Sequence, residues 1–128
     1  MSILCDTTVI IDILRGVEPA VVWARSLQER PACSEVTRVE VLRGMQTRER
    51  RATERLFGTL AWITIDEAIA RHAGELGRTW RGSHQGIATA DLIIAATAEL
   101  HGRELATLNV KHFPMFAGLA PPYPPWTR

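Results

Sequence analysis

Cysteine is scarce in this chain, and long apolar runs are missing from it. Its 128 residues include two cysteines, Cys5 and Cys33, and both lie in apolar segments typical of strands. Buried reduced thiols are the ordinary outcome there, so we expect no disulfide framework and a reducing, cytoplasmic environment. No run approaches the roughly 20 apolar residues of a membrane span, and the N-terminal segment has no basic region typical of a secretion signal. We therefore expect no contact with a membrane, and the length predicts a single domain over residues 1–128.

Lysine is almost absent as well. Lys111 is the only lysine among 15 basic residues, and all the others are arginines, whose planar guanidinium suits phosphate and carboxylate groups. The 14 acidic residues nearly cancel them, so the net charge of +1 argues neither for nor against a nucleic-acid partner. The segment 38–55 is less balanced, with six arginines against three glutamates, although a solvated helix face would explain that segment alone. These arginines are Arg38, Arg43, Arg48, Arg50, Arg51 and Arg55.

Several familiar site motifs are also missing. The histidines His72, His84, His101 and His112 show no metal-ligand spacing, and there is no Cys-x-x-Cys pair, so a zinc site is not expected. The chain has no Walker loop, no Gly-x-Gly-x-x-Gly turn and no Gly-x-Ser-x-Gly elbow. These absences remove the common nucleotide-binding and acyl-transfer functions.

The apolar pattern alternates between strands and helices. It predicts strands at 2–5, 32–33, 61–65 and 104–108, and helices at 8–14, 18–30, 66–80 and 90–100. The arginine-rich segment up to about residue 58 continues a helix that follows the second strand, as a long arm or a hairpin. This alternation predicts an α/β fold with a short parallel sheet of four or five strands, covered by helices on both faces. A ligand site is expected beyond the carboxyl ends of the strands, near Asp6 and Asn109.

Asp6 is the first candidate for such a site. It directly follows the first predicted strand and precedes Thr7 and Thr8, whose hydroxyls could orient its carboxylate. The same position also suits an N-cap of the helix that begins near Thr8, and position alone does not choose between the two roles. Asp12, a turn and a half further on, is expected to be an exposed residue that interrupts an apolar face.

Asp91 and Glu40 are the other two candidates. Asp91 precedes a helix that is apolar all round, where an unpaired buried carboxylate would be costly. A metal ion, an arginine or the positive end of its own helix must therefore compensate its charge. Glu40 could instead complete a capping box with Thr37, unless the helix begins near Ser34, as the apolar spacing favours.

Together these candidates form a set of oxygen ligands. Carboxylates without nitrogen or sulfur partners suit Mg²⁺ or Mn²⁺, and these ions suit phosphate chemistry, because they activate water and stabilise the charge of in-line attack. Nearby arginines would then hold the phosphates of a polynucleotide.

Four segments of the chain resemble the PIN-domain ribonucleases, and among them the VapC toxins of bacterial toxin–antitoxin pairs. They are residues 3–16, 34–44, 86–98 and 105–113, in the family's order and over nearly the whole chain. The resemblance implies metal ligands at Asp6, Glu40 and Asp91, catalysis by these residues together with Asn109, and metal-dependent cleavage of RNA. It also implies that Thr7 helps to hold the first carboxylate.

The fourth segment departs from the family. Many relatives have a further acid where Asn109 or His112 stands here. The carboxamide of Asn109 can bind a metal-bound water but adds no negative charge, so we expect one firmly held ion. Thr107 is expected to orient a water or the backbone. The resemblance further implies a homodimer and a cognate VapB-type antitoxin that inserts a peptide into the acidic site, with DNA reached only through the antitoxin.

Two rival functions remain at this point. A PIN-like domain that has lost its fourth acid could act as an RNA- or protein-binding module with weak or no nuclease activity. A phosphatase of the haloacid-dehalogenase type also begins with an aspartate after a strand, but it needs a second aspartate where Thr8 stands.

Overall fold

Four short parallel strands form the centre of the molecule. The computed structural model describes residues 2–83 and 86–124. Its strands are β1 (Ile3–Cys5), β2 (Ala32–Ser34), β3 (Ala61–Ile63) and β4 (Glu104–Ala106), in the order β3-β2-β1-β4. All three neighbouring pairs are parallel. The predicted α/β fold is confirmed, with four strands in the sheet. Three residues of the loop and tail segments, His84, Gln85 and Pro125, lie outside the described residues.

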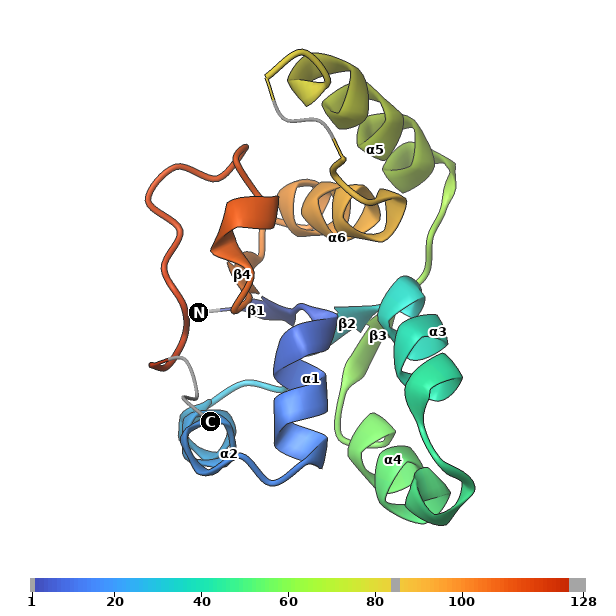
Figure 1. Ribbon diagram of the computed structural model, residues 1–128, viewed down its shortest axis with the longest axis vertical. Helices are drawn as coiled ribbons and strands as arrows, with labels where there is room; N and C mark the ends of the chain where they lie inside the picture. The colour runs from blue at the N-terminus through green and yellow to red at the C-terminus, as the bar shows by residue number, and fades with distance from the viewer. Residues whose placement is uncertain (1, 84–85, 125–128) are drawn as a thin grey trace.

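Helices cover both faces of this sheet (Figure 1). On one side lie α1 (Thr7–Leu14) and α2 (Glu18–Ser26), and on the other lie α5 (Glu67–Trp80) and α6 (Thr89–Leu100). The alternation of side chains along a strand separates two cores. Leu4, Ala32 and Leu105 pack toward α5 and α6, whereas Cys5, Cys33 and Ala106 pack toward α1 and α2.

Both cysteines are free and buried, as predicted. Burial, with a smaller contribution from the charge of Asp6, raises the pKa of the Cys5 thiol to about 12. Burial also raises the pKa of Cys33. Both groups are therefore protonated at neutral pH. None of the helices within the described ranges is long and apolar enough to cross a membrane.

The arginine-rich segment forms a hairpin of two helices. After α3 (Glu35–Gly44) the chain makes a short 3-10 turn, η1 (Thr47–Glu49), and then α4 (Arg50–Phe57). The Glu49 carboxylate accepts the N–H of Gln46 at 2.6 Å and caps this turn. The hairpin alternative is the correct one, since a capped turn separates the two helices.

Arg38 does not belong to the exposed basic surface that the sequence suggested. Its guanidinium lies 3.9 Å from the centre of the Trp62 ring, and it binds Glu35 at 2.6 Å. The hydrogen bond to Glu35 is the main cause of the raised pKa of Arg38. The other five arginines of the segment are exposed: Arg43, Arg48, Arg50, Arg51 and Arg55.

Asp12 is also placed differently from the prediction. It was expected at the surface, but only 6% of it is exposed, and its Oδ2 accepts the hydroxyl of Tyr123 at 3.0 Å. The reason is the C-terminal segment, whose Tyr123 is buried in the core that α1 and α2 share and contacts Trp23 of α2. Burial is likewise the main cause of the raised pKa of Tyr123, followed by its bond to Asp12.

Candidate metal centre

Asp6 lies where β1 ends and α1 begins, and it is the N-cap that the sequence allowed, while its role in a site stays a prediction. Its side chain is the N-cap of α1, since Oδ1 accepts the N–H of Thr7 at 2.7 Å. It is also a buried carboxylate, 2% exposed, whose Oδ2 accepts the hydroxyls of Thr107 at 2.6 Å and Thr8 at 3.1 Å. Burial raises the pKa of Asp6, and these three hydrogen bonds lower it only in part.

Glu40 projects from α3 and is held by Thr7. The Thr7 hydroxyl donates to Glu40 Oε1 at 2.6 Å and lies 3.0 Å from the hydroxyl of Thr37. A hydroxyl has one proton to donate, so Thr37 is the donor to Thr7, and the two bonds form a chain that ends on the carboxylate. The helix begins at Glu35 with Ser34 as its cap, so the capping box between Thr37 and Glu40 is wrong.

Asp91 stands in the first turn of α6. Its N-cap, Ala88, has no side chain that could cap the helix, and the Asp91 carboxylate is 16% exposed. One oxygen, Oδ2, lies 3.0 Å from Nδ1 of His112. Burial raises the pKa of Asp91, the charges of Asp6 and Glu40 raise it further, and the bond to His112 opposes them.

The three acids therefore lie near one another at the carboxyl edge of the sheet, without forming a closed cluster. The charge of Glu40 raises the pKa of Asp6, and both act on Asp91, so each carboxylate lies within electrostatic reach of the others. The set consists of hard oxygen donors, which suit a divalent cation. Within residues 2–83 and 86–124, no three His, Cys, Asp or Glu side chains are close enough to form a ready coordination shell. Mg²⁺ needs no such shell, because it keeps several waters and takes one or two carboxylates directly.

The segment after β4 contributes the remaining polar groups. Thr107 is fully buried, and of the two roles expected for it, orienting a water or the backbone, it fills the second, since it holds the backbone of Asn109; it also binds Asp6 directly. The Asn109 N–H donates to Thr107 Oγ1 at 3.0 Å, which leaves the Thr107 hydroxyl to donate to Asp6. The catalytic role predicted for the Asn109 side chain stays a prediction. The sequence indicated Thr37 only as a helix cap, and no local pattern indicates its bond to Thr7, which joins residues 30 positions apart.

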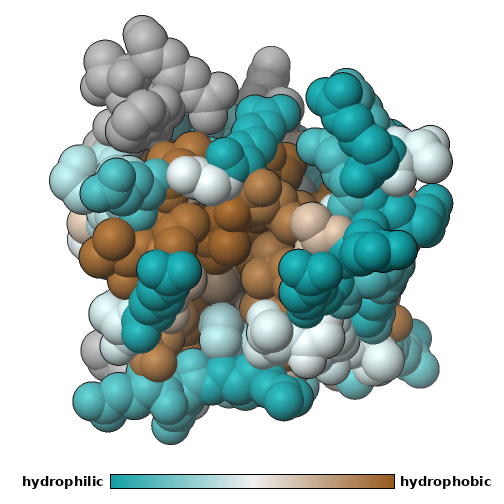
Figure 2. Space-filling view, turned by 90° about the horizontal axis from the view of Figure 1, so that it is seen from below, coloured by the Kyte–Doolittle hydropathy of each residue, from teal (hydrophilic) through white to brown (hydrophobic). Residues whose placement is uncertain are grey.

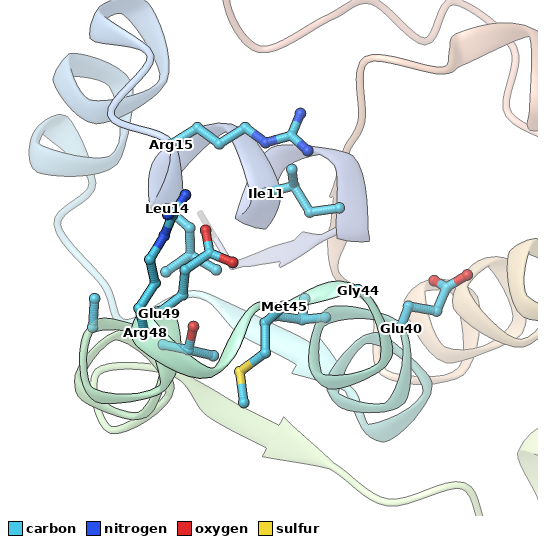
Figure 3. A pocket seen from close by; sticks show the side chains of 11 residues that line it. Ile11, Leu14, Arg15, Glu40, Gly44, Met45, Arg48 and Glu49 are labelled. Atoms are coloured by element: carbon cyan, nitrogen blue, oxygen red, sulfur yellow. The ribbon is translucent and has the colours of Figure 1, made fainter.

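A groove adjoins the carboxylates on the side of α1, α3 and α4. Figure 2 shows apolar side chains gathered in a hollow on this face, and Figure 3 shows the groove close by. Its volume is about 400 Å³, and Glu40 lies at one end of it. The apolar lining comes from α1, α3 and the turn after α3. Two arginines border it, one directly after α1 and one in η1. These residues are Ile11, Leu14, Val41, Met45, Arg15 and Arg48, and Glu49 also lines the groove beside Arg48.

Comparisons with known proteins agree with this geometry. The PIN domain family matches residues 3–117. Ribonuclease VapC19 and Ribonuclease VapC10, both of Mycobacterium tuberculosis, are each 45% identical to the chain over 123 residues. These alignments cover 94% of the chain and 98% and 92% of the two relatives.

Solved structures with the same fold include two toxin–antitoxin assemblies. The toxin–antitoxin complex from Klebsiella pneumoniae superposes with a TM-score of 0.82 and 31% identity, over 95% of this chain and 98% of the other. VapBC2 from Rickettsia felis, bound to a DNA fragment from its promoter, superposes with a TM-score of 0.78 and 20% identity. This match covers 93% of this chain and 96% of the other. The family match and the 45% identity decide the family. This chain belongs to the PIN-domain family, as its four segments predicted.

Proposed function

We propose that this chain is a metal-dependent endoribonuclease that acts as the toxin of a toxin–antitoxin pair. The observation that carries the proposal is the placement of Asp6, Glu40 and Asp91, from three separate elements, near one another at one edge of the sheet. The names of the relatives support it, because both Mycobacterium tuberculosis proteins are called ribonucleases. The family also favours this reaction over the phosphatase alternative.

Mg²⁺, or Mn²⁺ in its place, is the ion that this donor set suits. Asp6, Asp91 and Glu40 would hold it, with at least one of the three acting through a metal-bound water. When bound, the ion supplies an activated water and neutralises charge on the phosphate that is attacked. One firmly held ion is expected, because Asn109 and His112 add no negative charge where relatives carry a fourth acid.

The chain's own residues hold the acids in place and bind the substrate. Thr7, Thr8 and Thr107 donate to carboxylate oxygens and fix their orientation before the substrate arrives. The exposed arginines of the α3–α4 hairpin would hold RNA phosphates. We choose two of them, Arg43 and Arg51, for substitution. Neutralising these two arginines should weaken RNA binding most at low salt, since exposed charges are screened at high salt.

Cleavage of a synthetic RNA in the presence of Mn²⁺ tests the proposed reaction. Asp6→Asn and Asp91→Asn should each abolish cleavage, whereas Asp66→Asn should not. Asp66 caps α5 through the N–H of Ile69, a role that asparagine fills equally well. The reaction would be wrongly assigned if Asp91→Asn cut RNA at the wild-type rate. A pure binding module would retard the RNA in a gel without shortening it.

The groove beside Glu40 is the surface that we propose for a VapB-type antitoxin. Its apolar floor matches the apolar side chains of a peptide, and a basic side chain at the end of the groove would reach Glu40. Met45→Arg should prevent a co-expressed antitoxin from co-purifying and from blocking cleavage. Leu100→Arg, which changes another exposed apolar residue at the end of α6, should leave both unchanged.

A homodimer and a cytoplasmic location complete the proposal. Val39 is 60% exposed on α3, outside the groove lining, and a second copy of the chain would cover such a residue. Sedimentation of the purified protein measures its oligomeric state directly. The buried free cysteines suit a reducing cytoplasm. DNA is expected to be bound only by way of the antitoxin.

A further inference from the structure

The backbone of His112 is held in place, although its imidazole side chain is half exposed to solvent. It ends the 3-10 turn η2 (Val110–His112), in which its N–H donates to Asn109 O at 2.9 Å. The next residue, Phe113, is 1% exposed and packs into the core that α6 also lines. The imidazole side chain is 54% exposed, but its backbone is fixed on both sides.

The ring contacts the proposed metal ligand Asp91. Nδ1 of His112 lies 3.0 Å from Oδ2 of Asp91. An ionised carboxylate can only accept a hydrogen bond, so Nδ1 carries the hydrogen and donates it. Both the neutral Nδ1–H ring and the charged ring can do this, so the contact does not depend on the protonation of the second nitrogen.

Asp91 needs such a donor because its other charged neighbours repel it. The negative charges of Asp6 and Glu40 both act against its ionised form. Ala88, the cap of α6, offers no side-chain group to hold the first turn. A half-buried carboxylate under this repulsion is stabilised when one of its oxygens is bound to a fixed donor.

The same short segment also holds the first acid. Thr107 donates to Asp6 Oδ2 at 2.6 Å, and the Asn109 N–H donates to Thr107 at 3.0 Å. Residues 107–112 therefore contact Asp6 at one end and Asp91 at the other. They keep the distance between carboxylates that come from the start of α1 and the start of α6.

We propose that His112 is a positioning residue, which fixes the Asp91 carboxylate by donating from Nδ1 to Oδ2 and so directs the other oxygen toward the metal and the substrate. The inference rests on the proposed metal-dependent function. In this chain the imidazole does by hydrogen bonding part of what a further acid would do by direct charge.

Three substitutions separate this role from its alternatives. Asparagine places an amide nitrogen about where Nδ1 lies, glutamine places one nearer to the position of Nε2, and leucine offers no donor. His112→Leu should weaken Mn²⁺ binding about tenfold, as measured by calorimetry, the usual effect of removing a partner of a metal ligand. His112→Asn should restore the wild-type affinity, and His112→Gln should resemble His112→Leu.

Matched controls keep the result interpretable. His101→Leu changes another exposed histidine at the opposite end of α6 and should leave Mn²⁺ binding unchanged. Metal-free His112→Leu should unfold at a slightly lower temperature than the wild type, because Asp91 loses its donor, whereas metal-free His112→Asn should unfold at the wild-type temperature. RNA cleavage by His112→Leu should fall through kcat, while KM for a synthetic RNA stays close to the wild-type value.

Two outcomes would overturn the inference. One is a wild-type Mn²⁺ affinity in His112→Leu. The other is rescue by glutamine but not by asparagine, which would mean that His112 acts through Nε2. Failure of the proposed function looks different, since wild-type protein would then neither bind Mn²⁺ nor cut RNA. In that case nitrogen NMR of the metal-free protein still tests whether Nδ1 carries the hydrogen.

Discussion

Two fully buried threonines, Thr37 and Thr107, are each connected to an acid of the site. Thr37 reaches Glu40 through the hydroxyl of Thr7, and Thr107 binds Asp6 directly. Each hydroxyl therefore supports an ionised carboxylate in a region of low dielectric, where an unmatched charge is expensive. The acids would carry the chemistry, but the threonine hydroxyls beside them stabilise the ionised state that binds a metal.

Thr107→Val should destabilise the metal-free protein by about 1–2 kcal/mol at neutral pH, because a buried carboxylate loses a donor. The bond from Thr107 lowers the pKa of Asp6, so it stabilises the fold only while Asp6 is ionised. The difference from wild type should therefore shrink as the pH falls and Asp6 becomes protonated. Urea unfolding at several pH values measures it.

Two variants serve as controls for that measurement. Thr107→Ser keeps the donor and should lose little stability. Thr97→Val removes a buried hydroxyl that donates to Ile93 O within α6, an uncharged acceptor, so its effect should not vary with pH. An equal loss at all pH values in Thr107→Val would show that only packing is affected.

The acids of the site could be predicted from the sequence, but most of their partners could not. Asp6, Glu40 and Asp91 stand out because a charge follows or interrupts an apolar segment. The bond between Thr107 and Asp6 joins residues 101 positions apart, and no local pattern encodes it. The cap role of Asp6 does not exclude its proposed role in the site, since one carboxylate oxygen caps α1 while the other accepts hydroxyls.

Among the elements, α5 and α6 are in tight contact at Gly77. A Cβ atom at Gly77 would lie 3.0 Å from Leu92 Cδ1, whereas one at Gly74 would meet nothing within 4 Å. Gly74→Ala should therefore stabilise the protein by about 0.5–1 kcal/mol, the gain expected when alanine replaces glycine in an exposed helix. Gly77→Ala should gain less or lose stability, because Leu92 must move.

Thermal unfolding of the two alanine variants, side by side, checks this. Leu92 follows Asp91 directly, so Gly77→Ala should also slow RNA cleavage, while Gly74→Ala should not. Equal stabilisation by both substitutions would mean that the contact between Gly77 and Leu92 does not limit the packing of these helices.

The elements themselves follow the apolar periodicity closely, and they differ from it where two local signals compete. Both Ser34 and Thr37 suit a helix cap, and β2 decides between them because it ends at Ser34 and leaves its side chain to accept the Val36 N–H. Arg38 has the charge of a surface residue, but Trp62 on β3 provides a face for its guanidinium to stack on. Such choices depend on neighbouring strands, which a single segment does not reveal.

At the scale of the whole molecule, the net charge of +1 is a sum of separated regions. Three acids lie near one another at the edge of the sheet, and exposed arginines lie along the hairpin beside it. A protein that binds a cation and a polyanion at adjacent places needs both regions, and their cancellation explains why total charge alone indicated no partner. The C-terminal segment stabilises this arrangement, since Tyr123 binds the buried Asp12 of α1.

The repulsion among the acids predicts how stability depends on pH and metal. Burial raises the pKa of Asp6 and of Asp91, so the folded chain holds these protons more tightly than the unfolded chain. Stability of the metal-free protein should therefore rise as the pH falls from neutral toward the ordinary carboxyl range, the reverse of the usual salt-bridged acid. Asp91→Asn should remove part of this dependence and stabilise the metal-free protein at neutral pH by about 0.5–1 kcal/mol.

Mn²⁺ should change this pH dependence. A ligand that binds only the folded state at about 100 times its Kd stabilises it by about 2.7 kcal/mol. At neutral pH the ionised acids should give this stabilisation, whereas near pH 5 protons compete with the ion and the gain should be smaller. Differential scanning fluorimetry with and without Mn²⁺ measures the metal-induced stabilisation at neutral pH and near pH 5. A metal-induced shift that is equal at the two pH values, or equal in Asp91→Asn, would place the ion elsewhere, because only binding at these carboxylates couples metal to their protons.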